Sequence, residues 1–358
     1  MKIYFVLSSV NDPHANKRVK DFERFGHETR IYGFLRHSHL KFGDDTQVLG
    51  RFTDDVPYIK RLSLYVRSLR RLFKKENGKD IIWYYQGLDI AMFSVLFNRK
   101  RRFIYEECDL VHTYVSNPLL RAVFERIDKY VIRKSLKTVT TSEGFIQYHY
   151  PSPQKRPDNI VLIPNRLSRD ILRLKSPEPH DADLGHLRFA YVGGMRFKTL
   201  LNVADAISEK FPQHEFHFYG FFDPMFPEAL RPHRPNVFYH GAFKSPVDLP
   251  DIYASVDVSI CTYDYHVDNV RYAEPNKLYE AIYFRCPIVA SKGTFLAEKI
   301  KSMGIGYECD PYAPEDIERM VLQVEKDYHE KLSTLASVER SVALDDESYV
   351  NDILDIHN

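Results

Sequence analysis

The stretch EPNKLYEAIYFRCPIVAS, residues 274–291, joins the start of a predicted helix to a short apolar run that is typical of a buried β-strand. Pro275 suits the first helical position, because its missing N–H would have no partner there. Lys277 is unexpected, since a cation in the first turn meets the positive end of the helix dipole at a cost of about 0.3–1 kcal/mol. An anion docked at this helix start would explain the lysine.

Short apolar runs alternate with helical patterns along the rest of the chain. One such helical pattern begins at His14 and ends at Gly26, a residue that commonly stops a helix. Alternating strands and helices indicate βα units around parallel sheets. Strands are predicted at 2–8, 28–34, 80–86, 102–107, 138–142 and 159–165, and again at 187–194, 215–221, 236–241, 256–263 and 286–291.

The chain has 358 residues, which is long for a single hydrophobic core, so two domains are expected. The stretch 168–186 is polar, holds two prolines and lacks hydrophobic periodicity, which predicts a linker. The predicted fold is α/β, with two Rossmann-like parallel-sheet domains and a cleft between them. The predicted parts are an N-terminal domain (1–167), the linker, a C-terminal domain (187–340) and a final helix that packs back on the first domain (341–358).

The cysteines and the hydropathy of the chain indicate the cellular compartment in which the protein is expected. The four cysteines form no CxxC pair, which argues for a reducing environment and against a disulfide framework or a cysteine zinc site. The first residues resemble a strand rather than a signal peptide. No apolar run approaches the roughly 18 residues of a membrane span. A cytoplasmic protein is expected.

Charge is divided unevenly along the chain. Residues 1–170 hold 31 Lys and Arg against 19 Asp and Glu, and residues 171–358 hold 19 against 30. The segment 58–79 places apolar residues at helical spacing among eight cations, and 98–102 adds four more. One interpretation is a core-packed helix with a solvated basic face, and the other is a helix held to anionic lipid. Nucleic acid is disfavoured, because the chain shows no recognised nucleic-acid module.

A second candidate anion site follows the strand at 187–194. The sequence YVGGMRFK, residues 191–198, leads from the strand through Gly193 and Gly194 to Arg196 and Lys198. Glycines let a phosphate approach the backbone, a helix start supplies N–H donors, and cations neutralise charge. An ordinary strand-to-helix turn with surface cations would look the same. The pattern is not GxGxxG, so the dinucleotide fingerprint is not met.

Two cationic helix starts on one parallel sheet favour a shared phosphate ligand. A diphosphate docked beside Lys277 would use both its ammonium and the free N–H groups of the helix. Glu280, one turn further along, could then accept hydrogen bonds from the vicinal hydroxyls of a ribose. The competing interpretation is a simple Lys277–Glu280 ion pair on the helix surface, which stabilises by only a few tenths of a kcal/mol.

These motifs together resemble a known family. PNKLYEAIYFRCPIVAS is similar to the signature P-x-K-x-x-E-(A/Y)-x-x-x-x-x-P-(I/V)-V-A-(S/T) of the retaining family 4 glycosyltransferases, which have the GT-B fold. YVGGMRFK resembles the family's strand–glycine–Arg/Lys element, and IPNRLS resembles its IPNG(V/I) motif. FYGFF around Gly220, YHGAF around Gly241 and TSEGF around Ser142 follow in the family's order. The N-terminal half matches mainly in pattern.

The resemblance implies transfer of a sugar from a nucleotide donor to an acceptor hydroxyl, with retention at the anomeric carbon. The C-terminal domain would bind the donor, with UDP-sugars favoured over GDP-sugars, and Arg196 and Lys277 would stabilise the departing diphosphate. Glu280 would hold the ribose. The remaining donor-binding positions implied by the family are Gly193, Gly194, Lys198, Gly220, Pro275 and Asn276. No metal or other cofactor is expected, and the sequence offers no evident DxD motif.

The sequence departs from the family in three places. Many members carry a second glutamate eight residues before the equivalent of Glu280, where this chain has Tyr272; Glu274 could replace it, or could be a solvent-facing acid. The loop after the first strand, residues 8–18, differs from the family's Gly-Gly loop and leaves the acceptor open. After the fourth predicted strand stand Glu107, Asp109 and His112, and Asp109 is predicted to contact the acceptor or sugar, although a helix-capping aspartate would look the same.

The expected acceptor is a glycan or lipid-linked glycan of surface polysaccharide assembly, which fits attachment of the basic helix to the inner face of a membrane. Two other functions are compatible with the residues. A nucleotide-sugar epimerase of the same fold would use the same donor site without an acceptor. A non-catalytic subunit that binds a partner transferase is favoured by Tyr272. The oligomeric state is not determined by the sequence.

Overall fold

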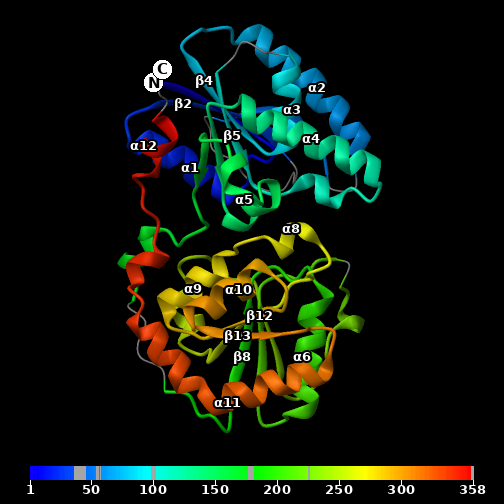
Figure 1. Ribbon diagram of the computed structural model, residues 1–358, viewed down its shortest axis with the longest axis vertical. Helices are drawn as coiled ribbons and strands as arrows, with labels where there is room; N and C mark the ends of the chain where they lie inside the picture. Colours follow the sequence, from blue (N-terminus) through cyan, green and yellow to red (C-terminus); the bar gives the residue numbers. More distant parts are fainter. Residues whose placement is uncertain are drawn as a thin grey trace. The chain divides into compact units, whose positions relative to one another are not determined.

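The computed structural model describes residues 1–35, 46–53, 56, 58–97, 102–175, 181–224 and 226–355. The chain forms two units: Met1–Ile163 together with Asp346–Asn358, and Pro164–Asp345. Each unit is built around one parallel sheet (Figure 1). No helix in the described ranges has the length and apolar character needed to cross a bilayer.

The first unit contains a seven-stranded sheet in the order β3-β2-β1-β4-β5-β6-β7, with every pair parallel. The strand order changes direction between β1 and β4, and such a switch point is where parallel sheets usually bind ligands. The strands are β1 (Lys2–Leu7), β2 (Glu28–Leu35), β3 (Thr46–Arg51), β4 (Ile81–Gln86), β5 (Phe103–Glu107), β6 (Lys137–Thr140) and β7 (Ile160–Leu162).

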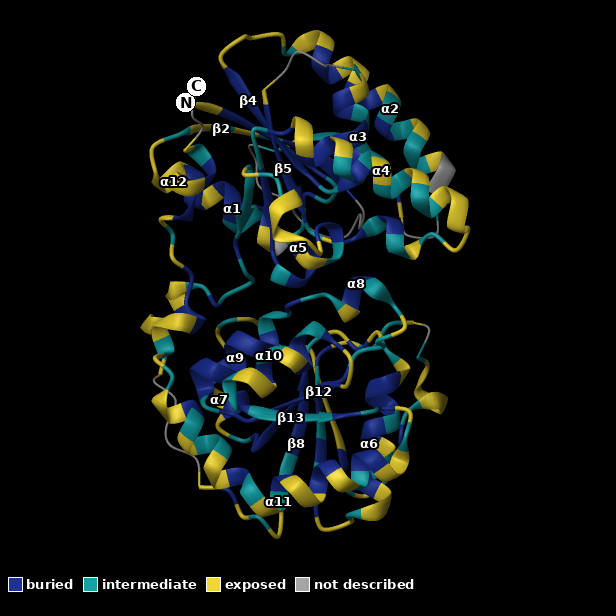
Figure 2. Cartoon of the chain, viewed as in Figure 1, coloured by how far each residue is buried: buried dark blue, intermediate teal, exposed yellow. Residues whose placement is uncertain are grey.

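Helices cover both faces of this sheet. α1 (Pro13–Arg24) and α12 (Tyr349–Leu354) pack on one face, and α2 (Tyr58–Lys75), α3 (Leu88–Phe97) and α4 (Pro118–Lys134) lie side by side on the other (Figure 1). The central strands β1, β4 and β5 are almost continuously buried (Figure 2). This explains why they read as apolar runs rather than as alternating patterns. The short elements of this unit are α5 (Glu143–His149), η1 (Val111–Tyr114) and η2 (Pro153–Lys155).

The second unit repeats the plan with the parallel order β10-β9-β8-β11-β12-β13, whose switch point lies between β8 and β11. α6 (Lys198–Lys210) and α11 (Pro314–Ser337) share one apolar cluster, and α7 (Leu249–Tyr253), α9 (Asn276–Phe284) and α10 (Phe295–Met303) share the other. The strands are β8 (Arg188–Val192), β9 (Glu215–Tyr219), β10 (Val237–Gly241), β11 (Val258–Cys261), β12 (Ile288–Ser291) and β13 (Gly306–Cys309). The short helices are α8 (Asp268–Arg271), η3 (Arg169–Arg173), η4 (Glu228–Leu230) and η5 (Arg340–Ala343).

The predicted α/β fold with two parallel sheets is confirmed, and the differences lie at the edges. Strands β3 and β13 were not predicted: each is an edge strand, and TQVLGR and GYEC lack the apolar run that a central strand shows. The stretch 168–186 was predicted to be a linker, yet it belongs to the second unit. Ile171 is almost fully buried in that unit's core, so its apolar side chain outweighs the polar composition around it.

The C-terminal segment belongs to the first unit from Asp346 onward. Val350 and Ile353 of α12 are fully buried in the cluster that α1 and the sheet form. The Tyr349 hydroxyl donates a hydrogen bond to Asp21, and the Arg18 guanidinium lies 4.5 Å from the centre of the Tyr349 ring. The last residues therefore complete the core of a domain whose other residues lie at the opposite end of the sequence.

This packing predicts that Ile353→Ala lowers the free energy of unfolding of the first unit by about 2–5 kcal/mol, because the deleted methyl groups leave a cavity. Trp83 is the only tryptophan of the chain and lies in the core of this unit, so its fluorescence follows the unfolding of this unit alone. Asp352→Ala, on the exposed side of α12, is the matched control and should leave the transition unchanged. Equal unfolding curves for the two variants would contradict the role of α12.

Candidate functional site

The carboxyl end of the second sheet brings together the glycines and the helix start that the sequence singled out. Gly193 directly follows β8, Gly220 follows β9, and α9 begins at Asn276 after the loop that leaves β11. These positions surround the switch point of the sheet, where an open parallel sheet leaves room for a ligand. The elements α9, β8 and β12 are labelled in Figure 1.

Two strand ends approach so closely that only glycine fits. Gly220 has φ +130°, and a Cβ built there would lie 2.1 Å from the carbonyl oxygen of Gly193. The Gly193 N–H donates to the Tyr219 oxygen at 2.7 Å, which fixes the two strand ends against each other. A Cβ on Gly193 would lie 2.9 Å from the Lys277 ammonium nitrogen. The glycines therefore let a lysine from another element reach the backbone at the end of β8.

Lys277 is buried, with 6% of its surface exposed. Its ammonium donates one hydrogen bond, to the Asn276 side-chain oxygen at 3.4 Å, and lies 5.6 Å from the centre of the Tyr191 ring. An ammonium has three N–H donors, so the described residues leave two of them without an acceptor. A buried cation in this state is stabilised by an anion. The geometry supports an anion site at Lys277.

Glu280 does not provide that anion directly. One of its oxygens accepts from the Tyr253 hydroxyl at 2.7 Å and the other from the Asn276 amide at 2.6 Å. In the part of the chain that the structure describes, no ion pair joins Glu280 to Lys277, so the simple helix pair is not formed. Asn276 links the two residues, because its amide nitrogen holds the carboxylate while its oxygen accepts from the lysine.

Electrostatics keep Lys277 charged. Burial, the largest influence, lowers its pKa, but the negative charge of Glu280 and smaller contributions raise it, and the net pKa of Lys277 lies above its usual value. Burial raises the pKa of Tyr191, and the positive charges of Lys277 and Arg196 oppose that rise. Both predicted cations therefore act on the same buried tyrosine at the end of β8.

The remaining candidate residues of the stretch 191–198 differ in exposure and in contacts. Arg196 is exposed and makes no hydrogen bond or ion pair among the described residues, so its guanidinium is available to a ligand. Gly194 is also exposed, and its carbonyl oxygen accepts from the Tyr191 hydroxyl at 2.9 Å. Lys198 begins α6 and lines a hollow with Asn202 and Asp205. Its described contacts do not bring it to Lys277.

Glu274 is held inside the second unit. It is 2% exposed, and its two oxygens accept hydrogen bonds from the Tyr279 hydroxyl and, at 2.7 Å, from the Lys299 ammonium. These contacts exclude the solvent-facing acid that the sequence allowed as an alternative. Tyr272 is half-buried next to Arg271, whose guanidinium lies 5.7 Å from the centre of its ring. The donor-sugar role of Glu274 stays a prediction.

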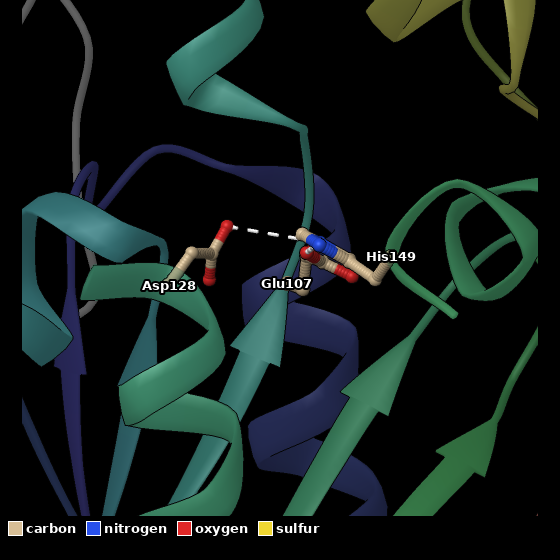
Figure 3. Close-up of side chains that lie close together, drawn as sticks. All are labelled: Glu107, Asp128 and His149. Carbon is tan, nitrogen blue, oxygen red and sulfur yellow. Dashed lines mark hydrogen bonds and ion pairs between the residues drawn. The ribbon is translucent and has the colours of Figure 1, made fainter. Parts of the chain in front are cut away.

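The loop after β5 separates two kinds of residue that the sequence grouped together. Asp109 is exposed, as a contact with an acceptor would require. Glu107 and His112 are instead fully buried, and they meet Asp128 of α4 and His149 of α5. Figure 3 shows Glu107, Asp128 and His149 pointing toward one another from a strand end and two helices. The sequence analysis singled out Glu107 and His112, but it did not connect them with Asp128 and His149, which lie further along the chain.

Comparison with known proteins gives the second unit a family likeness. Residues 191–338 match the model of the glycosyl transferases group 1, and this range holds the whole site around Lys277. The second unit is therefore similar to the domains of that family. Over 334 residues the chain is 22% identical to the succinoglycan biosynthesis protein ExoL of Rhizobium meliloti (strain 1021), covering 86% of this chain and 80% of the relative.

Solved structures extend the likeness to both units. Sucrose-phosphate synthase from Thermosynechococcus elongatus superposes with a TM-score of 0.66 at 14% identity, covering 94% of this chain and 92% of the other. Alr3699/HepE of Anabaena, in complex with UDP and glucose, also superposes with a TM-score of 0.66, at 15% identity and with 99% and 98% coverage. These similarities confirm the predicted GT-B fold.

Some residues of the site around Lys277 could not be found from the sequence. Tyr191 and Cys261 lie near Lys277, and Tyr263 interacts with both of them. Burial raises the pKa of Cys261 to about 12, so its thiol stays protonated. Tyr253, which holds Glu280, comes from α7. All four looked like ordinary strand or helix residues, and only the fold brings them to α9.

The close approach at the strand ends gives a prediction for the second unit. Gly220→Ala should push the Gly193 backbone out of place, so that it lowers the thermal stability of the domain and weakens nucleotide binding. Gly241→Ala is the matched control: Gly241 has φ +76°, and a Cβ there would meet no atom within 4 Å. The control should cost only about 1 kcal/mol of backbone strain.

Calorimetric unfolding and UDP titration of both variants measure the difference. Equal loss of stability and equal affinity for UDP in the two variants would contradict the role of the Gly193–Gly220 contact.

Proposed function

We propose that the protein is a retaining, metal-independent glycosyltransferase. It transfers a sugar from a nucleotide sugar, UDP-sugars being favoured over GDP-sugars, to a hydroxyl of a glycan or lipid-linked acceptor in surface polysaccharide biosynthesis. The observation that carries this proposal is the buried Lys277 ammonium, which has one described acceptor and lies beside the Gly193 backbone at the switch point of the sheet.

The arrangement suits a departing nucleoside diphosphate. As the bond between the sugar and the diphosphate breaks, negative charge gathers on the phosphate oxygens. Cations and N–H groups fixed beforehand stabilise this charge more strongly in the transition state than in the ground state. Pro275 stands at the N-cap of α9 and carries no side-chain acceptor, so the first N–H groups of the helix remain available to the phosphate.

The other residues have assigned roles in the same proposal. Arg196, exposed and near Tyr191, is the second cation for the diphosphate. Glu280 accepts from the ribose hydroxyls and is oriented for this by Tyr253 and Asn276. Glu274 contacts the donor sugar, and Asp109 contacts the acceptor. Catalysis needs no metal in this account, because Lys277 and Arg196 supply the positive charge.

The relatives support the substrate classes. ExoL is named for succinoglycan biosynthesis, which fits a surface polysaccharide acceptor. Alr3699/HepE was solved with UDP and glucose, which fits a UDP-sugar donor.

The first test replaces the cation at the helix start. Lys277→Ala should reduce sugar transfer by at least about 100-fold, because it removes a charge that acts mainly on the leaving group. Its melting temperature should stay within a few degrees of the wild type, since the packing lost with the side chain is offset by the desolvation cost that a poorly paired buried ammonium carries. Lys326→Ala, at an exposed lysine of α11, is the control and should keep full activity.

The assay measures sugar transferred from UDP-sugars and GDP-sugars by the protein as purified, without added divalent metal, and NMR gives the anomeric configuration of the product. Full turnover of Lys277→Ala would refute the assignment of Lys277. Release of an epimerised sugar from donor alone would indicate an epimerase instead. An inverted product, or activity only with added metal, would refute the retaining or the metal-independent mechanism, respectively.

We also propose that the first unit binds an anionic membrane surface through α2. Its apolar side packs into the core through Tyr65, Leu69, Leu72 and Phe73, so this part of the helix is structural. The opposite side remains exposed and carries Lys60, Arg67, Arg70, Arg71, Lys74 and Lys75. Of the predicted extension at 98–102, only Arg102 lies within the described residues, and it is exposed.

Helix α4 adds apolar side chains that no core covers. Leu119 is 79% exposed and Leu120 is 53% exposed, and Val123 and Tyr130 are also exposed on the same helix. Arg133 and Lys134 end the helix. An apolar stretch followed by cations suits the boundary between lipid tails and anionic headgroups.

Vesicle co-sedimentation tests this surface. Reversing three charges together, Arg67→Glu, Arg71→Glu and Lys74→Glu, should weaken binding to phosphatidylglycerol vesicles by at least about 100-fold, because each cation contributes about 1 kcal/mol and each glutamate adds repulsion. Lys326→Glu is the control. Binding that is equal on phosphatidylglycerol and phosphatidylcholine vesicles, or unchanged by the reversal, would contradict the proposal.

A further inference from the structure

The first unit contains a buried cluster of two carboxylates and two imidazoles. Glu107 ends β5, His112 lies in η1, Asp128 belongs to α4 and His149 closes α5. All four are at most 4% exposed. Charged and titratable groups are rarely buried to this extent unless they are paired or coordinate a metal.

Each carboxylate uses one oxygen for a fixed hydrogen bond and turns the other into the cluster. The Thr140 hydroxyl donates to Glu107 Oε2 at 3.3 Å, and the Tyr105 hydroxyl donates to Asp128 Oδ1 at 3.0 Å. Glu107 Oε1 lies 2.6 Å from His149 Nε2, whereas Asp128 Oδ2 has no hydrogen-bond partner in the described structure. Carboxylates that bind metals are typically oriented by such outer hydrogen bonds.

His112 is the least satisfied member of the cluster. It is completely buried, and neither ring nitrogen has a hydrogen-bond partner among the described residues. Its Nδ1 lies 3.4 Å from Asp128 Oδ2, which is the unpartnered oxygen. An imidazole in this state lacks the hydrogen bonds that buried polar groups normally make, and it faces an equally unpartnered acceptor. Both atoms point to a ligand between them.

We propose that Glu107, His112, Asp128 and His149 bind one divalent transition-metal ion of the zinc class, and that this site has a structural role. Two nitrogen and two oxygen ligands suit zinc, and sites with four protein ligands are usually structural because they leave no position for substrate. The scattered cysteines exclude a thiolate site but not one built from imidazole and carboxylate.

The ligand atoms of Glu107, Asp128 and His149 lie within 4.8 Å of one another, and His112 lies outside this group. Tetrahedral coordination by all four residues therefore needs two adjustments, one of which is a movement of the His112 ring toward the other ligands. Ligand atoms about 2.1 Å from a tetrahedral zinc ion lie about 3.4 Å from each other. Asp128 Oδ2 is 3.4 Å from His112 Nδ1 and 3.8 Å from His149 Nε2. The Glu107–His149 pair, now at 2.6 Å, must open as the ion replaces the proton that these two groups share. The displaced proton leaves to solvent, so ion binding should release protons.

The charges balance in this arrangement. Two carboxylates carry −2 and two neutral imidazoles carry none, so a divalent ion makes the buried site neutral. The ion would connect β5, η1, α4 and α5 at the carboxyl edge of the first sheet. It would also fix the loop that carries Asp109, two residues after Glu107. The proposed metal-independent catalysis is unaffected, because this ion would not touch the nucleotide sugar.

Metal analysis of the untagged full chain tests the site directly. Protein purified without chelator should contain about one equivalent of a first-row transition metal per chain. Removal of the ion with a strong chelator should lower the melting transition reported by Trp83 fluorescence, and added Zn²⁺ should restore it with release of protons. His112→Gln should lose the ion and its response to Zn²⁺, whereas His329→Gln, at an exposed histidine of α11, should keep both.

The wild-type measurements stand even if the His112 variant fails to fold. Less than about 0.1 equivalent of metal, together with a melting transition that neither chelator nor Zn²⁺ moves, would overturn the proposal and show that protons alone hold the cluster. Zinc retained by folded His112→Gln would overturn the role of His112. Neither result bears on sugar transfer, so failure here is distinct from failure of the proposed function.

Discussion

The second unit depends on one incompletely satisfied interaction, that of the buried Lys277 ammonium with the side-chain oxygen of Asn276. The fold keeps this lysine charged although it is nearly removed from water, and it places the charge at the positive end of α9. Two residues allow the charged ammonium to occupy this position. Gly193 has no side chain and leaves room for it, and Asn276 binds Glu280 and keeps that carboxylate from pairing with the lysine. Keeping a charged ammonium buried with one acceptor costs free energy. An anion that pairs with it offsets this cost and therefore binds more tightly, because the site is organised before its ligand arrives.

The two units differ in net charge and in the ligand that we propose for each. The acidic half of the sequence forms most of the domain that carries the proposed diphosphate site, so the positive charge at Lys277 and Arg196 is local rather than general. The basic half forms most of the first unit, in which α2 carries six exposed cations outside the aromatic core around Trp83. The same amphipathic pattern therefore serves folding on one face and, in our proposal, attraction to anionic lipid on the other.

The sequence predicted the two parallel sheets and the strand ends at Gly193 and Gly220, because central strands read as apolar runs between helices. It missed the edge strands β3 and β13, whose residues are partly polar, and it took the buried Ile171 for part of a linker. At the site, Lys277 was found because its charge conflicts with the helix dipole. Tyr253 was missed, and so was the contact of Glu107 and His112 with Asp128 and His149, since tertiary contacts between distant residues leave no local pattern.

The most direct test of the central claim is calorimetric binding of UDP and of uridine to the wild type and to Lys277→Met, which keeps the aliphatic side chain without its charge. If Lys277 binds the diphosphate, the wild type prefers UDP to uridine by at least about tenfold more than the variant does, while both proteins bind uridine alike. An equal preference for UDP in the two proteins would show that the ammonium does not contact the diphosphate, and it would contradict the account.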